Sequence, residues 1–192
     1  MAESLKNQTA KGLLWGGLSN GLVQLLGSLC DIVMLRTLTP GDYGKIAVLL
    51  VFSAIANNLQ ESGFVAALCN KKEPKHEDYN AVFWFNIIVS VSVYVILWVA
   101  SPFIADFYHD EALTPLARYL FIGFLMSGFG TVQRAYVFGH LMVKQNSIII
   151  IVALLVSNVI GVSMVLSGFA YWGLATQSVA YIAVTTLLYW RV

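Results

Sequence analysis

Six apolar blocks divide this 192-residue sequence, and each is long enough to cross a lipid bilayer. A transmembrane helix needs about 20 mostly apolar residues, because the hydrocarbon core is about 30 Å thick and each residue adds about 1.5 Å. The predicted spans are residues 12–35, 43–68, 79–104, 119–143, 147–166 and 169–189. Helices satisfy every backbone hydrogen bond internally, as hydrocarbon requires. The sequence therefore predicts an all-α membrane protein with six transmembrane helices.

Composition excludes other classes of protein. Apolar residues make up 58% of the chain and charged residues 11%, with a mean hydropathy of +0.75, which is incompatible with a soluble globular domain. The formal net charge is only +1, so we expect no basic surface for nucleic acid and no nucleic-acid partner. Cys30 and Cys69 have a spacing that fits neither a disulfide framework nor a zinc site, and we interpret them as packing residues.

Short polar segments separate the apolar blocks. Residues 39–42 (Thr-Pro-Gly-Asp) combine a proline, a glycine and a capping aspartate, which predicts a tight turn followed by a helix start. The other connections are predicted at residues 70–78, 106–118, 144–146 and 167–168.

Basic residues predict the orientation of the spans. Seven lie on the side of the two termini: Lys6, Lys11, Lys71, Lys72, Lys75, Lys144 and Arg191. Three lie on the other side: Arg36, Lys45 and Arg118. Because cytoplasmic loops carry the excess of lysine and arginine, we expect both termini and residue 74 in the cytoplasm and residue 110 outside.

Three charged residues fall inside predicted spans: Asp31, Glu61 and Arg134. An ionised side chain at the bilayer centre costs at least about 2.5–3.5 kcal/mol, so each is a candidate functional residue. Glu61 precedes Lys71 by ten residues, and Arg134 precedes Lys144 by ten. Both should therefore lie about 15 Å inside the cytoplasmic boundary, where they could pair. Alternatively Arg134 holds an anionic ligand, since a guanidinium matches phosphate bidentately. We assign Asp31 and Glu61 to ion coupling or to an ion pair.

Polar and small residues recur at helical spacing in three of the spans. The three faces consist of Asn20, Gln24, Gly27 and Asp31; of Ser53, Asn57, Gln60 and Glu61; and of Ser127, Gly130, Thr131 and Arg134. Such faces also occur where transmembrane helices simply pack and hydrogen-bond to each other, and this interpretation stays open. The candidate substrate-binding residues are Arg134, Asn20, Gln24 and Asn57.

Signals of enzymatic chemistry are weak. His76, His109 and His140 fall in or beside loops without the spacing of metal ligands. The sequence contains neither a glycine-rich phosphate loop nor a nucleophile elbow. We therefore expect a transport protein rather than an enzyme, with no metal and no cofactor. A membrane-embedded lipid-modifying enzyme, the less favoured alternative, would need a paired acid and base at one membrane face.

Four short motifs resemble a known family. They are residues 35–44 (Leu-Arg-Thr-Leu-Thr-Pro-Gly-Asp-Tyr-Gly), 61–68 (Glu-Ser-Gly-Phe-Val-Ala-Ala-Leu), 83–86 (Phe-Trp-Phe-Asn) and 132–136 (Val-Gln-Arg-Ala-Tyr). In order and spacing they resemble the Wzx-type polysaccharide flippases of the multidrug, oligosaccharidyl-lipid and polysaccharide exporter superfamily. The resemblance covers nearly the whole chain. Many members carry aspartate where this sequence has Glu61.

The resemblance implies a function. Such a protein moves an undecaprenyl-diphosphate-linked oligosaccharide, a unit of O-antigen, capsule or exopolysaccharide, across the bacterial inner membrane by alternating access between two helical bundles. The implied partners are the lipid-linked oligosaccharide, membrane lipid, and polysaccharide polymerase and assembly proteins. We expect residues 1–192 to be the N-terminal bundle, with the C-terminal bundle absent, so that the chain is a fragment. In the family the first two helices of a bundle face the central cavity, in agreement with the polar faces of residues 12–35 and 43–68.

A cation-coupled drug or metabolite antiporter of the same superfamily is the alternative transport function. Such an antiporter needs a carboxylate, whereas a carrier of a lipid diphosphate also needs a cation to bind the anion. Arg134 therefore favours the diphosphate carrier.

Overall fold

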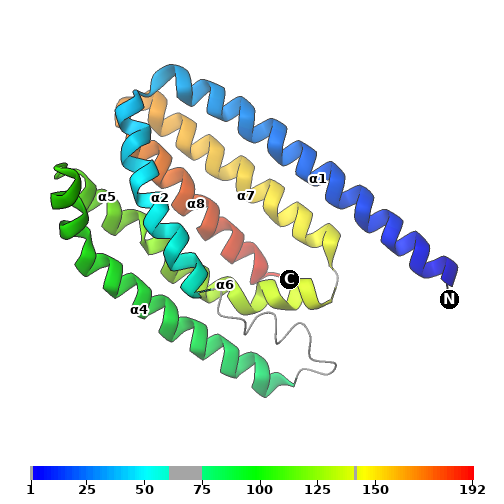
Figure 1. Cartoon of the computed structure of the whole chain (residues 1–192). Helices are drawn as coiled ribbons and strands as arrows, with labels where there is room; N and C mark the ends of the chain where they lie inside the picture. The colour runs from blue at the N-terminus through cyan, green and yellow to red at the C-terminus, as the bar shows by residue number, and fades with distance from the viewer. Residues whose placement is uncertain (1, 61–74, 141) are drawn as a thin grey trace.

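The computed structural model describes residues 2–60, 75–140 and 142–192, and this part of the chain contains helices and short connections but no strand. The helices are α1 (Ala2–Thr37), α2 (Pro40–Gln60), α4 (His76–Tyr108), α5 (Leu113–Leu120), α6 (Ile122–Gly139), α7 (Val143–Met164), the π-helical turn η1 (Val165–Phe169) and α8 (Tyr171–Tyr189) (Figure 1). The all-α prediction is confirmed.

The six predicted spans are largely helical over the residues described, but the span predicted at 119–143 is interrupted at Phe121 and its helix ends at Gly139. In the span predicted at 169–189, α8 begins only at Tyr171. Among the described residues, three helical segments are long and apolar enough to cross a membrane: His76–Tyr108, Leu113–Gly139 and Val143–Phe169. Six transmembrane helices remain a prediction. The connection predicted at residues 144–146 is wrong in position, because α7 already begins at Val143. Lys144, Gln145 and Asn146 are polar, but none of them breaks a helix as proline or glycine does.

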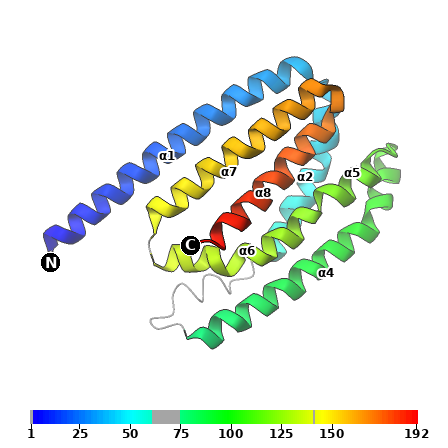
Figure 2. The same cartoon turned by 180° about the vertical axis from the view of Figure 1, so that it is seen from behind.

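Five of the helices form one row, and α2 lies across this row. Along the row α1 packs on α7, α7 on α8, α8 on α6, and α6 on α4, as both views show (Figures 1 and 2). Helix α2 crosses the row and contacts α8, α4 and α5. We call the end with the connections at residues 38–39, 109–112 and 165–170 the hairpin end. The opposite end, with His76, His140 and Val192, is the terminal end.

The turn predicted at residues 39–42 is confirmed. Helix α1 ends at Thr37 and α2 begins at Pro40, where proline costs no helical hydrogen bond. Both the backbone N–H and the hydroxyl of Thr39 donate to Oδ2 of Asp42, at 3.0 and 2.7 Å. The Asp42 N–H donates back to Oγ1 of Thr39 at 3.3 Å. This reciprocal cap fixes the reversal of the chain. At residues 167–168, also predicted as a turn, Gly168 has a φ of +87°, which favours glycine.

Small residues let the helices approach closely. A Cβ added to Gly128 of α6 would lie 2.6 Å from the Cβ of Ser90 in α4, and one added to Gly161 of α7 would lie 2.7 Å from the Cβ of Gln177 in α8. Transmembrane helices associate through such contacts because hydrocarbon provides little hydrophobic driving force between them. Large apolar side chains of α4 point outward instead; Phe103 and Phe107 are 70% and 76% exposed. These features are those of a membrane protein.

Candidate functional site

The polar face of α1 is exposed at the surface of the bundle. Asn20, Gln24 and Asp31 are exposed, whereas Met34 is fully buried where α1 meets η1 and α2. Gly27 is half-buried. Three of the four residues that the helical spacing placed on one face are thus available to a ligand or to another part of the protein.

The polar residues of α2 lie partly in the interior of the bundle and partly at its surface. Ser53 is buried, and its hydroxyl has no hydrogen-bond partner among the described residues. Asn57 is exposed. Glu61, the predicted counterpart of Arg134, lies outside the described residues, so the pair stays a prediction.

Arg134 lies on the exposed side of α6. Its guanidinium carbon is 5.7 Å from the centre of the Phe138 ring, and it forms no ion pair with a described residue. Gly130, predicted on the same polar face, instead packs on α8: a Cβ there would lie 3.0 Å from the Thr186 hydroxyl, which donates to the Met126 carbonyl at 3.1 Å. The helix-packing interpretation therefore fits Gly130, and Arg134 is accessible.

Two cations at the hairpin end are held within the bundle. Lys45 of α2 pairs with Asp110 at 3.2 Å and lies 4.7 Å from the centre of the Tyr171 ring in α8. Arg118 of α5 donates from Nε to the Ser101 hydroxyl at 3.1 Å and stacks 4.0 Å over the Trp98 ring of α4. Both cations connect neighbouring helices, which is a structural role.

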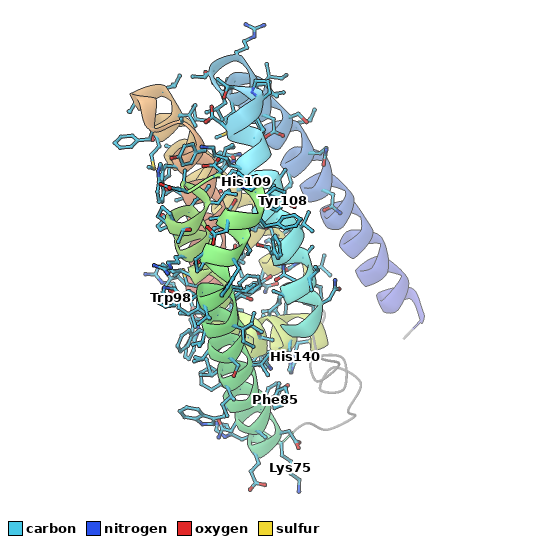
Figure 3. All side chains as sticks on the ribbon, turned by 60° about the vertical axis from the view of Figure 1, so that its left-hand side comes forward. Lys75, Phe85, Trp98, Tyr108, His109 and His140 are labelled. Atoms are coloured by element: carbon cyan, nitrogen blue, oxygen red, sulfur yellow. The ribbon has the colours of Figure 1, made fainter. Side chains whose placement is uncertain are left out.

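The three histidines do not converge. His109 lies at the hairpin end of α4, and His140 follows α6 toward the opposite end, where α4 begins at His76 (Figure 3). Within the described ranges, no three histidine, cysteine, aspartate or glutamate residues come together as metal ligands would.

A cavity that the sequence analysis did not predict opens at the terminal end. It measures about 420 Å³ and lies between the start of α4, the second half of α6 and the end of α8. Its lining, which we call the aromatic cavity, consists of His76, Tyr79, Val132, Gln133, Tyr136, Val137, Tyr189, Trp190 and Val192. Val132, Gln133 and Tyr136 of this lining belong to the family motif at residues 132–136, but the motif itself did not indicate a cavity.

Comparisons with known proteins agree on one family. Residues 33–192 match the family described as polysaccharide biosynthesis protein. The lipopolysaccharide biosynthesis protein WzxC of Escherichia coli (strain K12) is 27% identical over 97% of this chain and 38% of its own length. The teichuronic acid biosynthesis protein TuaB of Bacillus subtilis (strain 168) is 27% identical over 66% of this chain and 26% of its own.

A third relative, the succinoglycan biosynthesis transport protein ExoT of Rhizobium meliloti (strain 1021), is 21% identical over 76% of this chain and 29% of its own length. The chain thus spans less than two fifths of the curated relatives that it matches. No solved structure matches it significantly.

Proposed function

This chain belongs to the polysaccharide biosynthesis protein family as a Wzx-type member, and from that premise we propose that it is one helical bundle of a lipid-linked oligosaccharide flippase. The family match over residues 33–192 is the observation that carries the proposal. The relatives are named for lipopolysaccharide, teichuronic acid and succinoglycan. In this proposal the substrate is an oligosaccharide on a membrane-bound carrier, which must cross the bilayer before assembly outside the cell.

In this proposal the protein crosses the bacterial inner membrane six times, with both termini in the cytoplasm. The terminal end of the bundle then faces the cytoplasm and the hairpin end faces outward. The excess of lysine and arginine on the side of the termini supports this orientation. Residues 1–192 form the first of two bundles that rock against each other.

The exposed polar side chains of α1 and α2 support a transport path beside them. Asn20, Gln24, Asp31 and Asn57 are exposed on helices that otherwise consist of membrane-type sequence. Polar groups facing hydrocarbon are costly, so in a membrane these residues must face water, substrate or another bundle. We propose that they line the path of the oligosaccharide between the two bundles.

Arg134 is the proposed contact for the diphosphate of the carrier. Its exposed guanidinium, without an ion pair to a described residue, can donate two parallel hydrogen bonds to phosphate oxygens. Asp31 and Glu61 are the proposed ion-coupling groups. The protein acts in this scheme as a transporter and catalyses no covalent step.

Complementation tests the function. Residues 1–192 would replace the matched part of WzxC in an Escherichia coli strain that lacks WzxC. We expect the chimaera to restore cell-surface polysaccharide, and Arg134→Lys to reduce it because lysine loses the bidentate geometry. A chimaera that inserts at normal levels but leaves the lipid-linked oligosaccharide on the cytoplasmic leaflet would contradict the proposal.

A further inference from the structure

Two long helical segments, α4 and the pair of α5 and α6, are each interrupted near the hairpin end. In α4, Pro102 has no N–H for the Trp98 carbonyl, and the Ser101 hydroxyl donates to that carbonyl instead at 2.8 Å. Between α5 and α6, the Phe124 N–H donates to the Phe121 carbonyl at 3.0 Å, three residues back, as in a 3₁₀ turn. The helix angle can change at both places more easily than in an unbroken α-helix, because the hydrogen-bond ladder is already incomplete there.

A side-chain contact places the two interruptions at the same level of the bundle. Arg118 of α5 donates from Nε to the Ser101 hydroxyl at 3.1 Å, and its guanidinium lies 4.0 Å over the Trp98 ring. Ser101 directly precedes Pro102 in α4. Arg118 precedes Phe121 by three residues, which is less than one helical turn. A line through the two interruptions is therefore an axis about which the chain between them can turn, and the Arg118 contacts lie next to that axis.

The chain between the interruptions, residues 102–121, folds back on itself at the hairpin end (Figure 1), and we call it the α4–α5 hairpin. The Asp110 N–H donates to the Ala105 carbonyl at 3.0 Å, and the Leu113 N–H donates to the Asp110 carbonyl at 3.1 Å. Oδ1 of Asp110 accepts from the Ala112 N–H at 3.0 Å. These bonds join α5 to the end of α4, so that the hairpin can move as one rigid body.

Polar contacts join the α4–α5 hairpin to α2 and α8 at two distances from the axis. At the tip, Oδ2 of Asp110 pairs with Nζ of Lys45 in α2 at 3.2 Å, and that cation also lies 4.7 Å from the centre of the Tyr171 ring in α8. Close to the axis, the Tyr119 hydroxyl donates to the Thr176 hydroxyl of α8 at 3.2 Å. A rotation displaces the tip most, so the ion pair is the contact that a movement of the hairpin must break.

Apolar packing alone does not fix the hairpin in a membrane. Leu116 and Ala117 are fully buried against the bundle, but lipid tails are as apolar as these side chains and can replace their neighbours. The side chains of the Lys45–Asp110 pair are 26% and 32% exposed, and such a pair adds only a modest stabilisation. The tip is therefore held by a contact that can be released and formed again.

We propose that the α4–α5 hairpin swings as one unit about its two interruptions, and that the Lys45–Asp110 pair is the latch that holds it against α2. When the pair separates, the tip moves away from α2 and α8, whereas the Arg118 contacts near the axis persist. The purpose of this movement rests on the proposed function. There the hairpin end faces outward, and alternating access needs a part that opens and closes the outer end of the path along α2.

Distances between paired spin labels measure the swing directly. The 192-residue chain in phosphatidylglycerol nanodiscs, with Cys30 and Cys69 replaced, would carry spin-labelled cysteines at positions 111 and 167 for pulsed electron paramagnetic resonance. Position 111 is exposed at the tip of the hairpin, and position 167 is exposed in η1. Positions 36 and 167, both outside the hairpin, form the reference pair. We expect one distance for the reference pair and two for positions 111 and 167, the longer one belonging to the released hairpin.

Two variants test the latch. Asp110→Asn removes the charge but keeps Oδ1 as the acceptor for the Ala112 N–H, so the connection should stay intact. It should raise the ratio of the longer to the shorter distance by about twofold to fivefold, the effect of a partly exposed ion pair. Lys45→Met should do at least as much, and the double variant should add little to it. The matched control is Asp106→Asn, at an exposed carboxylate of α4 that forms no ion pair with a described residue, and it should change neither distance.

A further pair of variants tests the axis. Pro102→Ala supplies the N–H that the Trp98 carbonyl lacks and completes the helical ladder, so the longer distance should become rarer, by about twofold or more. Pro115→Ala is the matched control inside the hairpin. Pro115 lies in the first turn of α5, where an N–H has no helical partner, and its replacement should leave both distances unchanged. An unchanged reference distance reports that each variant keeps the fold.

Two results would overturn the proposal. Either the 111–167 distance stays single in both latch variants, or Pro102→Ala and Pro115→Ala give the same distances. A working WzxC chimaera together with either result rejects the swing alone. A swing in the 192-residue chain together with an inactive chimaera rejects the flippase function instead.

Discussion

Two residues that are adjacent in the sequence can lie in different environments. Gln133 places its oxygen in the interior, whereas Arg134, the next residue along α6, is exposed. Because successive residues on a helix differ by about 100°, one can line a cavity while the next faces a membrane or a ligand. The cost of an exposed guanidinium in hydrocarbon makes Arg134 the residue whose replacement is most informative.

Replacing Arg134 distinguishes a role of this residue in ligand binding from a role in the stability of the bundle. Arg134→Lys in the WzxC chimaera should lower transport while insertion is unchanged, because no described residue depends on this guanidinium for an ion pair. Transport and membrane expression would be measured on the same cells. If Arg134→Ala instead destabilises the bundle, and a second change Glu61→Gln restores both folding and transport, then Arg134 is structural.

The contribution of the cap at the start of α2 to the free energy of unfolding should be measurable. Asp42→Ala removes the acceptor for the Thr39 N–H and hydroxyl and should lower the free energy of unfolding by about 1 kcal/mol. Unfolding in detergent with increasing denaturant, followed by helical circular dichroism, gives the value. Glu111→Ala, at an exposed acidic residue of the same end, is the control and should change little. Equal effects of the two changes would argue against the cap.

At the scale of elements, glycines decide how closely helices pack. Gly128→Ala should destabilise the contact of α6 with α4 by about 1–3 kcal/mol, because the added methyl group overlaps Ser90. Gly44→Ala in α2 meets nothing within 4 Å and should be neutral or stabilising by up to about 1 kcal/mol, since alanine favours helix. Unfolding of both variants in the same detergent provides the comparison, and a neutral Gly128→Ala would contradict the packing.

Hydropathy predicted where helices lie but not how they pack. The Thr39–Asp42 turn followed from the local chemistry of proline and aspartate, which needs no distant partner. The aromatic cavity joins α4, α6 and α8, far apart in the sequence, and no local pattern predicts such a contact. Helices that are apolar on every side give no periodic signal for the face that packs. The exposure of Arg134 was unpredictable for the same reason.

At the scale of the whole molecule, the proposed six-span topology places the hairpin end and the terminal end on opposite sides of a membrane. Residue 74 should be accessible from the cytoplasm and the connection between α4 and α5 from outside, because of the distribution of lysine and arginine. Single cysteines at positions 74 and 111, with Cys30 and Cys69 replaced, would be labelled by an impermeant maleimide in intact cells. Labelling at position 74 but not at 111 would reverse the orientation.

The central claim is that this bundle contributes to moving a lipid-linked oligosaccharide across a bilayer. Its most direct test is a flipping measurement with the purified chimaera in liposomes, where a glycosidase outside reports which oligosaccharides have crossed. We predict crossing by the chimaera and none by the 192-residue chain as a monomer, because alternating access needs a second bundle. Liposomes in which the chimaera leaves the substrate as inaccessible as in protein-free vesicles would contradict the account.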